Sequence, residues 1–94
     1  MTVKIIIQRK VNDENVIELT VLLKKLRSLT LEQSGYISGE TLSRIDNTEE
    51  TLVISTWRSL EDWNSWVNNP KRTEIQSEID TLLGHETEYA MYST

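Results

Sequence analysis

The sequence predicts a single α+β domain of ferredoxin-like β-α-β-β-α-β order, with both helical segments on one face of a four-stranded antiparallel sheet. Three observations lead to this fold. Apolar residues alternate near both ends of the chain and in two central segments, as they do in strands. Leucines, and later tryptophans and isoleucines, recur at helical spacing between those segments. The 94 residues, 37% of them hydrophobic, suffice for one core, so one domain is expected over residues 1–94.

The first half of the chain should contain a strand, a helix and a second strand. Residues 3–8 are rich in β-branched side chains and alternate in polarity, as expected of a strand. A helix follows, for which Asn15 and Glu18 form a capping pair at the start. Its apolar face consists of Leu19, Leu22, Leu23, Leu26 and Leu29. Gly35 can adopt the left-handed conformation that ends helices, and the second strand then runs from 36 towards 45.

The second half should begin with a hairpin and a short helix. Turn-forming residues at 46–50 precede a strand at 51–57, so this strand should pair with the one before it. Ser59, three residues before Asp62, predicts an N-cap for the short helix. The apolar face of that helix consists of Leu60, Trp63, Trp66 and Val67.

Proline and glycine mark the remaining boundaries. Pro70 restarts the helix, because proline suits the first helical turn, and Gly84 ends it. Residues 86–92 then alternate as the last strand. Gly39 lies inside the second strand, where a bend or bulge is favoured over a ligand that approaches the backbone.

The third strand has apolar residues on both faces, because Leu52 and Ile54 alternate with Val53 and Trp57. Helices on one side of the sheet leave the other side uncovered. A chain this short, without cysteines, also gains stability from association. We therefore expect a homodimer in which two sheets pack face to face.

Acidic residues outnumber basic ones by 15 to 10, which gives a net charge of -5. Such a chain repels a phosphate backbone, so no nucleic-acid partner is expected. No apolar run approaches the ~20 residues of a membrane span or forms an export signal, so we expect no membrane partner and a cytoplasmic location. The basic residues form no long stripe and are interpreted as solvated faces; they include Lys24, Lys25, Arg27, Lys71 and Arg72.

The sequence offers few groups for metal or nucleotide chemistry. With no cysteine and one histidine, the usual zinc ligand sets cannot be assembled, and no phosphate-binding glycine motif is present. His85 is more typical of a strand edge than of a general base. We therefore expect neither a bound metal nor a cofactor.

The aromatic residues are the best candidates for a ligand pocket. There are three tryptophans and three tyrosines but no phenylalanine, so every aromatic side chain carries a hydrogen-bonding group. Trp57 ends the third strand, Trp63 and Trp66 lie on the next helix, and Gln8 and Gln76 could add neutral hydrogen-bonding groups. These five residues are the candidate substrate pocket. The alternative is that the tryptophans only fill the core.

Residues 34–37 (SGYI) and 52–70 (LVISTWRSLEDWNSWVNNP) resemble the antibiotic biosynthesis monooxygenase family. The shared pattern is a strand ending in tryptophan, a capped short helix and a second tryptophan before a helix break, and the resemblance covers nearly the whole chain. It implies the fold of a dimeric α/β barrel. Family members include cofactor-independent oxygenases of polyketide quinols, haem-degrading enzymes and proteins without assigned activity, so the resemblance implies no single function.

The resemblance places two kinds of site on this sequence. The Asn, Trp and His of haem-degrading members correspond to Gln8, Trp66 and Gln76. Because the imidazole that would bind iron is replaced, haem degradation is the less favoured activity. The Asn, Trp, Tyr and Arg of quinol-oxidising members correspond to Val53, Trp57, Trp63 and Gln76. The amide and the positive charge of that second pattern are therefore missing at these positions.

Three hypotheses follow for the function. The first is a cofactor-independent monooxygenase that acts on a small planar, quinol-like substrate between the sheet and the helices. The second is a non-catalytic, small-ligand-binding or stress-associated dimer with the same pocket. The third is that the tryptophans are purely structural, which predicts no cavity near Trp57 and Trp66.

Overall fold

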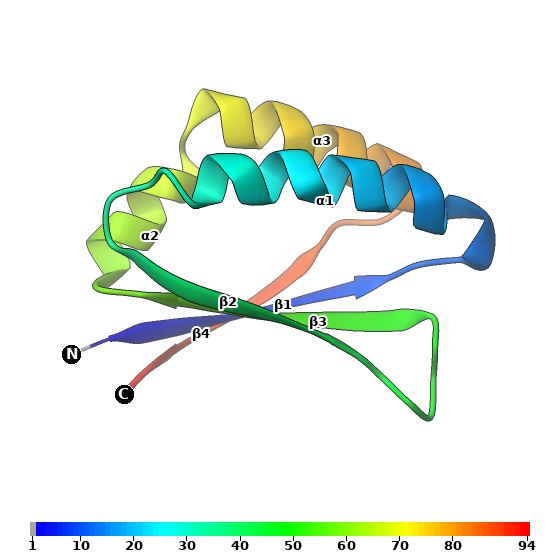
Figure 1. Cartoon of the computed structure of the whole chain (residues 1–94), viewed down its shortest axis with the longest axis horizontal. Helices are drawn as coiled ribbons and strands as arrows, with labels where there is room; N and C mark the ends of the chain where they lie inside the picture. Colours follow the sequence, from blue (N-terminus) through cyan, green and yellow to red (C-terminus); the bar gives the residue numbers. More distant parts are fainter. Residues whose placement is uncertain (1) are drawn as a thin grey trace.

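The structure, a computed structural model, describes residues 2–94. The elements in chain order are β1 (Val3–Lys10), the 3-10 turn η1 (Asp13–Asn15), α1 (Val16–Thr30), β2 (Tyr36–Ser43), β3 (Glu50–Trp57), α2 (Leu60–Val67), α3 (Pro70–Leu83) and β4 (Glu88–Ser93). The four strands form one antiparallel sheet in the order β2-β3-β1-β4. All three α-helices lie on the same side of this sheet (Figure 1). The predicted ferredoxin-like α+β fold is confirmed.

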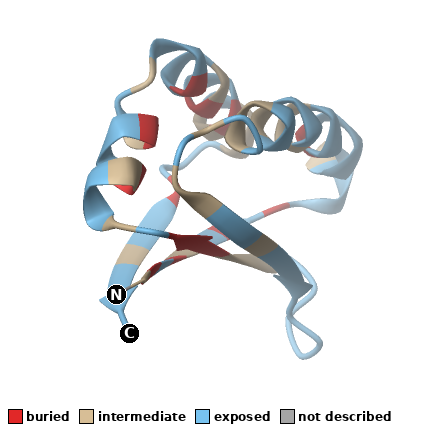
Figure 2. Cartoon of the chain, turned by 60° about the vertical axis from the view of Figure 1, so that its left-hand side comes forward, coloured by how far each residue is buried: buried red, intermediate tan, exposed pale blue. Residues whose placement is uncertain are grey.

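The register of β1 and β3 separates an inner from an outer face of the sheet. Ile5 lies opposite Ser55 on the inner face and is fully buried, whereas Ile6 lies opposite Ile54 on the outer face and is half-buried. The helices bury the residues that they turn toward the sheet and expose the rest (Figure 2). The predicted alternation of β1, and the apolar residues on both faces of β3, are thus confirmed.

The core consists of two clusters of buried side chains. The first lies beside α2 and contains Val3, Ile5, Ile7, Trp57, Trp63 and Trp66. The second joins α1 to α3 and contains Val11, Leu19 and Ile79. Leu26 packs against both clusters. Each large apolar side chain that is fully buried contributes roughly 1.5–3 kcal/mol to folding, so the two clusters fix α1 above the sheet.

The predicted start of α2 and end of α3 are confirmed. Ser59 has an extended backbone (φ -151°, ψ 161°), and its hydroxyl oxygen accepts a hydrogen bond from the backbone N–H of Asp62 at 3.2 Å. Asn69 caps α3 through its side chain, with Pro70 in the first turn. Gly84 follows α3 in the left-handed conformation (φ +76°). None of the helices described over residues 2–94 has both the length and the apolar character to cross a membrane.

The predicted cap of α1 is wrong. The turn η1 leaves Asn15 with φ -102° and ψ -3°, and its side chain makes no capping hydrogen bond. The Asn15 amide instead donates to the carbonyl oxygen of Leu82 at 3.3 Å and so joins the start of α1 to the end of α3. The other end of α1 also differs, because the helix stops at Thr30, before the turn in which Gly35 has φ +85°.

Three strand boundaries differ from the prediction by two residues. β1 continues to Lys10 rather than ending at residue 8. β2 ends at Ser43 rather than continuing towards 45, and Arg44, the next residue, forms ion pairs with Asp46 and Glu50. β4 begins at Glu88 rather than at 86. These differences change the ends of the strands and leave the centre of the sheet as predicted.

Candidate functional site

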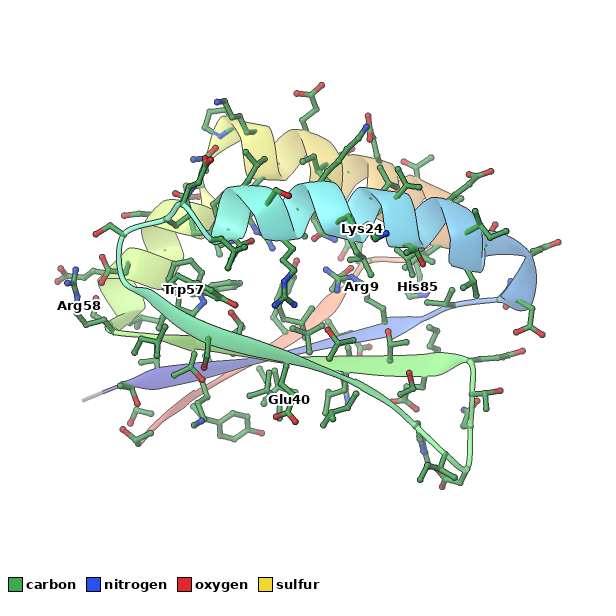
Figure 3. All side chains as sticks on the ribbon, viewed as in Figure 1. Arg9, Lys24, Glu40, Trp57, Arg58 and His85 are labelled. Carbon is green, nitrogen blue, oxygen red and sulfur yellow. The ribbon has the colours of Figure 1, made fainter. Side chains whose placement is uncertain are left out.

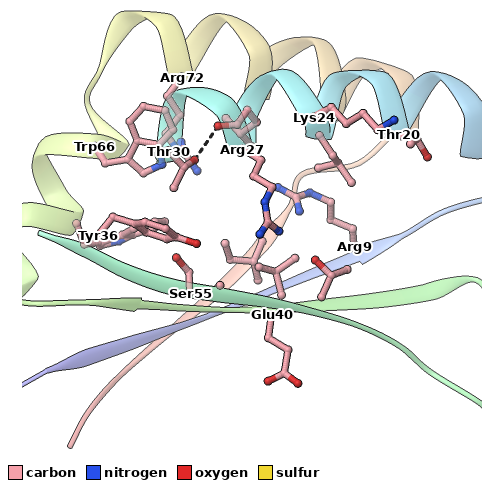
Figure 4. Close-up of a pocket in the computed structure, with 17 residues that line it drawn as sticks. Arg9, Thr20, Lys24, Arg27, Thr30, Tyr36, Glu40, Ser55, Trp66 and Arg72 are labelled. Carbon is pink, nitrogen blue, oxygen red and sulfur yellow. Dashed lines mark hydrogen bonds between the residues drawn. The ribbon is translucent and has the colours of Figure 1, made fainter. Parts of the chain in front are cut away.

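A cavity of about 230 Å³ lies between the inner face of the sheet and α1 (Figure 4). Its lining comes from all of the helices and from β1, β2 and β3, so the fold itself forms it rather than one loop. The apolar part of the lining consists of Ile7, Leu23, Leu26, Val53, Trp63 and Trp66. Protein interiors contain few voids larger than a water molecule, so a cavity of this size is a candidate ligand site.

Aromatic side chains form the wall of the cavity near α2. Trp63 and Trp66 line it directly and are 4% and 3% exposed. Trp57 is completely buried behind them and contacts the ring of Trp63 edge-on, with centroids 5.7 Å apart. Tyr36 meets Trp57 in the same way at 5.3 Å and lines the cavity. All three tryptophans belong to the core, and Trp63 and Trp66 also border the cavity, whereas Trp57 does not.

Two hydroxyl groups lie among these rings. The indole N–H of Trp57 donates to Ser55 Oγ at 2.8 Å, and Ser55 is buried at the cavity floor. Because Ser55 Oγ accepts this bond, its own O–H is the group left to donate to a ligand. The Tyr36 hydroxyl lies against Gly39, where a Cβ atom would be only 2.6 Å from the phenol oxygen. Gly39 is therefore required for the close approach of Tyr36.

The cavity is also lined by four cationic side chains, Arg9, Lys24, Arg27 and Arg72. The single carboxylate among the lining residues, that of Glu40, points away from the cavity on the other side of the sheet (Figures 3 and 4). The interpretation of the basic residues as solvated faces is wrong for Arg72, which is only 6% exposed. It is incomplete for Lys24 and Arg27, which are exposed overall but border the cavity.

Arg9 is the most buried of these cations. It is 3% exposed, and its one side-chain hydrogen bond is a long one, from Nη2 to Gln76 Oε1 at 3.4 Å. Its Nε atom is buried with no partner. Desolvation by burial lowers the pKa of Arg9. The group nevertheless stays charged at neutral pH, because a guanidinium is effectively always protonated in proteins.

Arg72 is held by aromatic rings. Its guanidinium lies over Trp63 at 5.6 Å and over Tyr89 at 5.5 Å from the ring centroids. Nη2 also donates to the Tyr89 hydroxyl at 2.6 Å. These cation–π contacts and the hydrogen bond fix the charge at the edge of the aromatic wall.

The two predicted glutamines do not line this cavity. Gln76 is buried, but its amide donates to Asp80 Oδ1 and to Thr87 Oγ1, both at 2.8 Å, while its oxygen accepts from Arg9. Gln76 therefore positions Arg9 from behind. Gln8 has the outward register of β1, opposite Leu52, and is exposed on the other face of the sheet. Of the five predicted pocket residues, Trp63 and Trp66 line the cavity, Trp57 and Gln76 support it, and Gln8 is separate.

Position 76, to which the resemblance assigns an arginine, holds a glutamine, and the cations that line the cavity lie at other positions of the chain. Arg9 comes from β1 and Arg72 from the first turns of α3. A signal for Arg9 was present in the sequence, since it continues the inward alternation of Val3, Ile5 and Ile7. Arg72 lies one turn before Gln76 on the same helix face.

No group of three or more His, Cys, Asp and Glu side chains capable of holding a metal occurs within residues 2–94. The histidine lies outside the cavity, at the edge of the sheet. His85 Nδ1 is 3.0 Å from the Glu86 carbonyl oxygen, and Nε2 is 3.0 Å from that of Lys10. His85 therefore contacts two backbone carbonyl groups outside the cavity and is not among the residues that could bind a ligand in it.

The fold and the cavity together define a small α+β protein with a cavity between its sheet and its helices. The family model described as antibiotic biosynthesis monooxygenase matches residues 2–78. The chain therefore belongs to the antibiotic biosynthesis monooxygenase family.

Solved structures share this fold at low sequence identity. A conserved protein from Methanosarcina mazei Go1 has a TM-score of 0.91 and 22% identity, over 100% of this chain and 93% of that chain. A protein from Mycobacterium tuberculosis has a TM-score of 0.86 and 16% identity, over 100% and 95% of the two chains. SnoaB, a cofactor-independent oxygenase from Streptomyces nogalater, has a TM-score of 0.81 and 14% identity, over 99% and 92%. No curated protein matches the sequence.

Proposed function

We propose that this protein is a cofactor-independent monooxygenase of a small planar, electron-rich substrate such as a quinol. The observation that carries the proposal is the cavity, which combines apolar and aromatic walls with inward-facing cations. Its volume of about 230 Å³ exceeds the ~150 Å³ that holds benzene and lies below the roughly 300–1,000 Å³ of sites for larger ligands. A substrate of one or two fused rings fits this volume.

The cations would favour ionisation of the substrate without a protein base, and the released proton would pass to the solvent. Among the described residues that line the cavity there is no imidazole, and the one carboxylate is turned away. A phenol near a guanidinium loses its proton more easily, because an opposite charge favours the ionised form. The ionised ring then donates electrons to O2. One oxygen atom forms a bond to a ring carbon, the O–O bond breaks, and the second oxygen leaves as water with two hydrogens of the substrate.

The aromatic wall and the hydroxyl groups would orient the substrate. A flat ring packs against Trp63 and Trp66, and the free O–H of Ser55 can donate to a substrate oxygen. The close packing of Trp57 and Tyr36 behind the ring excludes water from one side. These contacts hold the substrate while O2 reacts with its exposed edge.

The test is oxygenation of naphthalene-1,4-diol under ¹⁸O2. The balanced reaction converts the diol and O2 to 2-hydroxy-1,4-naphthoquinone and water. We expect protein-dependent formation of this product with one ¹⁸O atom, measured by mass spectrometry, whereas spontaneous oxidation yields unlabelled naphthoquinone. Formation of naphthoquinone alone, at the rate seen without protein, would contradict an oxygenase and favour the non-catalytic ligand-binding alternative.

The haem-degrading alternative finds no support in the contacts of Gln76. The amide at this position is already bonded to Arg9, Asp80 and Thr87, so it has no free group to direct at an iron atom. We therefore propose no haem chemistry for this chain.

We further propose that the protein acts as a homodimer through the outer faces of two sheets. The supporting observation is a group of apolar side chains in the middle of that face, opposite the helices: Ile6, Leu42, Leu52 and Ile54. Sheets with one face on helices and an apolar second face need a second layer to cover them.

A further inference from the structure

The cavity concentrates positive charge in a molecule whose net charge is -5. The three ion pairs within residues 2–94 involve Arg44 and Arg58, and neither of these lines the cavity. None of the four cavity cations therefore forms an ion pair with a carboxylate of those residues, although Asp80 acts on Arg9 from a distance, through Gln76. A net acidic protein has ample Asp and Glu to neutralise these groups, so their isolation points to an anion from outside.

Arg9 makes this point most strongly. Burying a charge is unfavourable unless it is paired and hydrogen-bonded, and buried polar atoms are rarely left without a partner. Arg9 is 3% exposed, yet its guanidinium has one hydrogen bond of 3.4 Å and a buried Nε without any. An apolar residue would continue the inward pattern of β1 without this penalty. Arg9 is thus arranged to receive an acceptor that the protein does not provide.

The second cation comes from the opposite layer. Figure 4 shows the guanidinium groups of Arg9 on β1 and Arg27 on α1 both directed into the middle of the cavity. Arg27 has no ion pair. Two like charges that face one space repel each other unless an anion lies between them. Arg72 is already held by Trp63 and Tyr89, so it stays with the aromatic wall.

We infer that the ligand of this cavity is an aromatic carboxylate of one or two rings, whose carboxylate binds between Arg9 and Arg27 while its ring packs against Trp63 and Trp66. A carboxylate matches the planar fork of a guanidinium and extends in the plane of the ring, which suits a narrow, mostly apolar space. The inference deepens the proposed function by naming the substrate class, a hydroxy-aromatic acid. It rests on the proposed function only for the statement that this ligand is oxidised.

Calorimetric titration with three matched probes tests the inference. The probes are 1-naphthol, 1-hydroxy-2-naphthoate and 1-naphthyl phosphate, which share the ring and differ in charge. We expect the naphthoate to bind about ten- to a hundredfold more tightly than naphthol, as for hydrogen bonds to a charged group. This advantage should persist at high salt, because a buried pair is screened far less than a surface pair. Equal binding of naphthol and naphthoate, or tighter binding of the phosphate, would overturn the carboxylate assignment.

The variant Arg9→Met localises the effect. Methionine fills a similar space without charge, so naphthol binding should be retained and the preference for the naphthoate lost. The variant should also have a higher melting temperature than the wild type, because an unpaired buried charge is removed. Arg44→Met, which removes an arginine outside the cavity, is the control and should keep the preference. A preference that survives Arg9→Met would contradict the site.

The carboxylate site and the oxygenase activity can fail independently in these experiments. Tight naphthoate binding with no oxygenation of 1,4-dihydroxy-2-naphthoate would leave the anion site in place and remove the oxygenase. Oxygenation of naphthalene-1,4-diol with no preference for a carboxylate would support the oxygenase and remove the anion site.

Discussion

At the residue scale, His85 gives the molecule a pH-dependent contact at the edge of the sheet. Both ring nitrogens face carbonyl oxygens at 3.0 Å, those of Glu86 and Lys10. A neutral imidazole can donate to only one of them, whereas the imidazolium donates to both. These two bonds, with a smaller contribution from Asp80, raise the pKa of His85 above 6.5, while weak desolvation and the charge of Lys10 act in the opposite direction.

We therefore expect NMR titration of the ring protons to give a pKa for His85 above the ~6.5 of an unfolded chain. Because the folded pKa is the higher one, the stabilisation by His85 is complete below about pH 6.5 and is lost as the pH rises through the folded pKa. The melting temperature should fall over this range, and His85→Gln should remove that part of the fall. A pKa at or below 6.5 would show that the two carbonyl contacts do not form in solution. The chain has one histidine, so the assignment is unambiguous.

Single residues also show how much of the candidate site could be predicted from the sequence. Trp63 and Trp66 were recognisable because aromatic residues at helical spacing must face a core or a ligand. Arg9 continues the inward alternation of β1, but this signal is weak because a charged residue near a strand end is normally solvated. Only the position of α1 above the sheet (Figure 1) decides that Arg9 is buried. Gln8 was predicted to reach the pocket, but it lies on the outer face of the sheet. It is next to the inward-facing Ile7, and adjacent residues of a strand point to opposite faces.

At the element scale, the position of Tyr36 in the cavity depends on Gly39 of the same strand. We expect Gly39→Ala to destabilise the protein by about 1–3 kcal/mol, the usual cost of overpacking. The reason is that the new Cβ would lie 2.6 Å from the Tyr36 hydroxyl, whose ring is held edge-on against Trp57. The measurement is the free energy of unfolding in urea.

Tyr36→Phe provides the matched background for this substitution. Without the hydroxyl oxygen, the nearest atom to the new Cβ is the ring carbon at 3.7 Å, an ordinary contact. Gly39→Ala should therefore cost much less in the Tyr36→Phe protein, which gives a large coupling energy in the double-mutant cycle. The same cost in both backgrounds would mean that the glycine is needed for the strand itself and not for Tyr36.

The helices show which of their ends can be predicted from capping residues in the sequence. The side chains of Ser59 and Asn69 cap α2 and α3 because each residue has an extended backbone, which turns its side-chain oxygen toward the free N–H groups of the next turn. Asn15 has a suitable side chain but follows a 3-10 turn, which gives it a helical backbone and removes the cap. The order of elements follows from local patterns, whereas this boundary depends on how η1 leads the chain into α1.

At the scale of the whole molecule, the uncovered face of the sheet determines the assembly we expect. It carries an apolar group, with Leu42 41% exposed and Ile6, Leu52 and Ile54 half-buried, and Glu40 lies opposite Ile54 at the border of this group. Tyr92 of β4 is 61% exposed and lies on the same face, opposite Lys4 of β1. We expect this face to bury its apolar centre against the same face of a second copy, in a two-fold symmetric interface.

We expect sedimentation velocity to show a dimer for the wild type and a monomer for Ile54→Lys. Ile54 lies on β3, one of the two central strands, so in a two-fold interface the new lysines of both subunits would be buried close together. Ile45→Lys is the matched control: it makes the same chemical change at the tip of the β2–β3 hairpin, where Ile45 is 95% exposed, and should leave the dimer intact. Circular dichroism would verify that both variants keep the fold. A wild-type monomer, or a dimer that Ile54→Lys does not weaken, would assign the apolar face to a different partner surface. Because the cavity lies on the opposite side of the sheet, the Ile54→Lys monomer should still bind 1-naphthol.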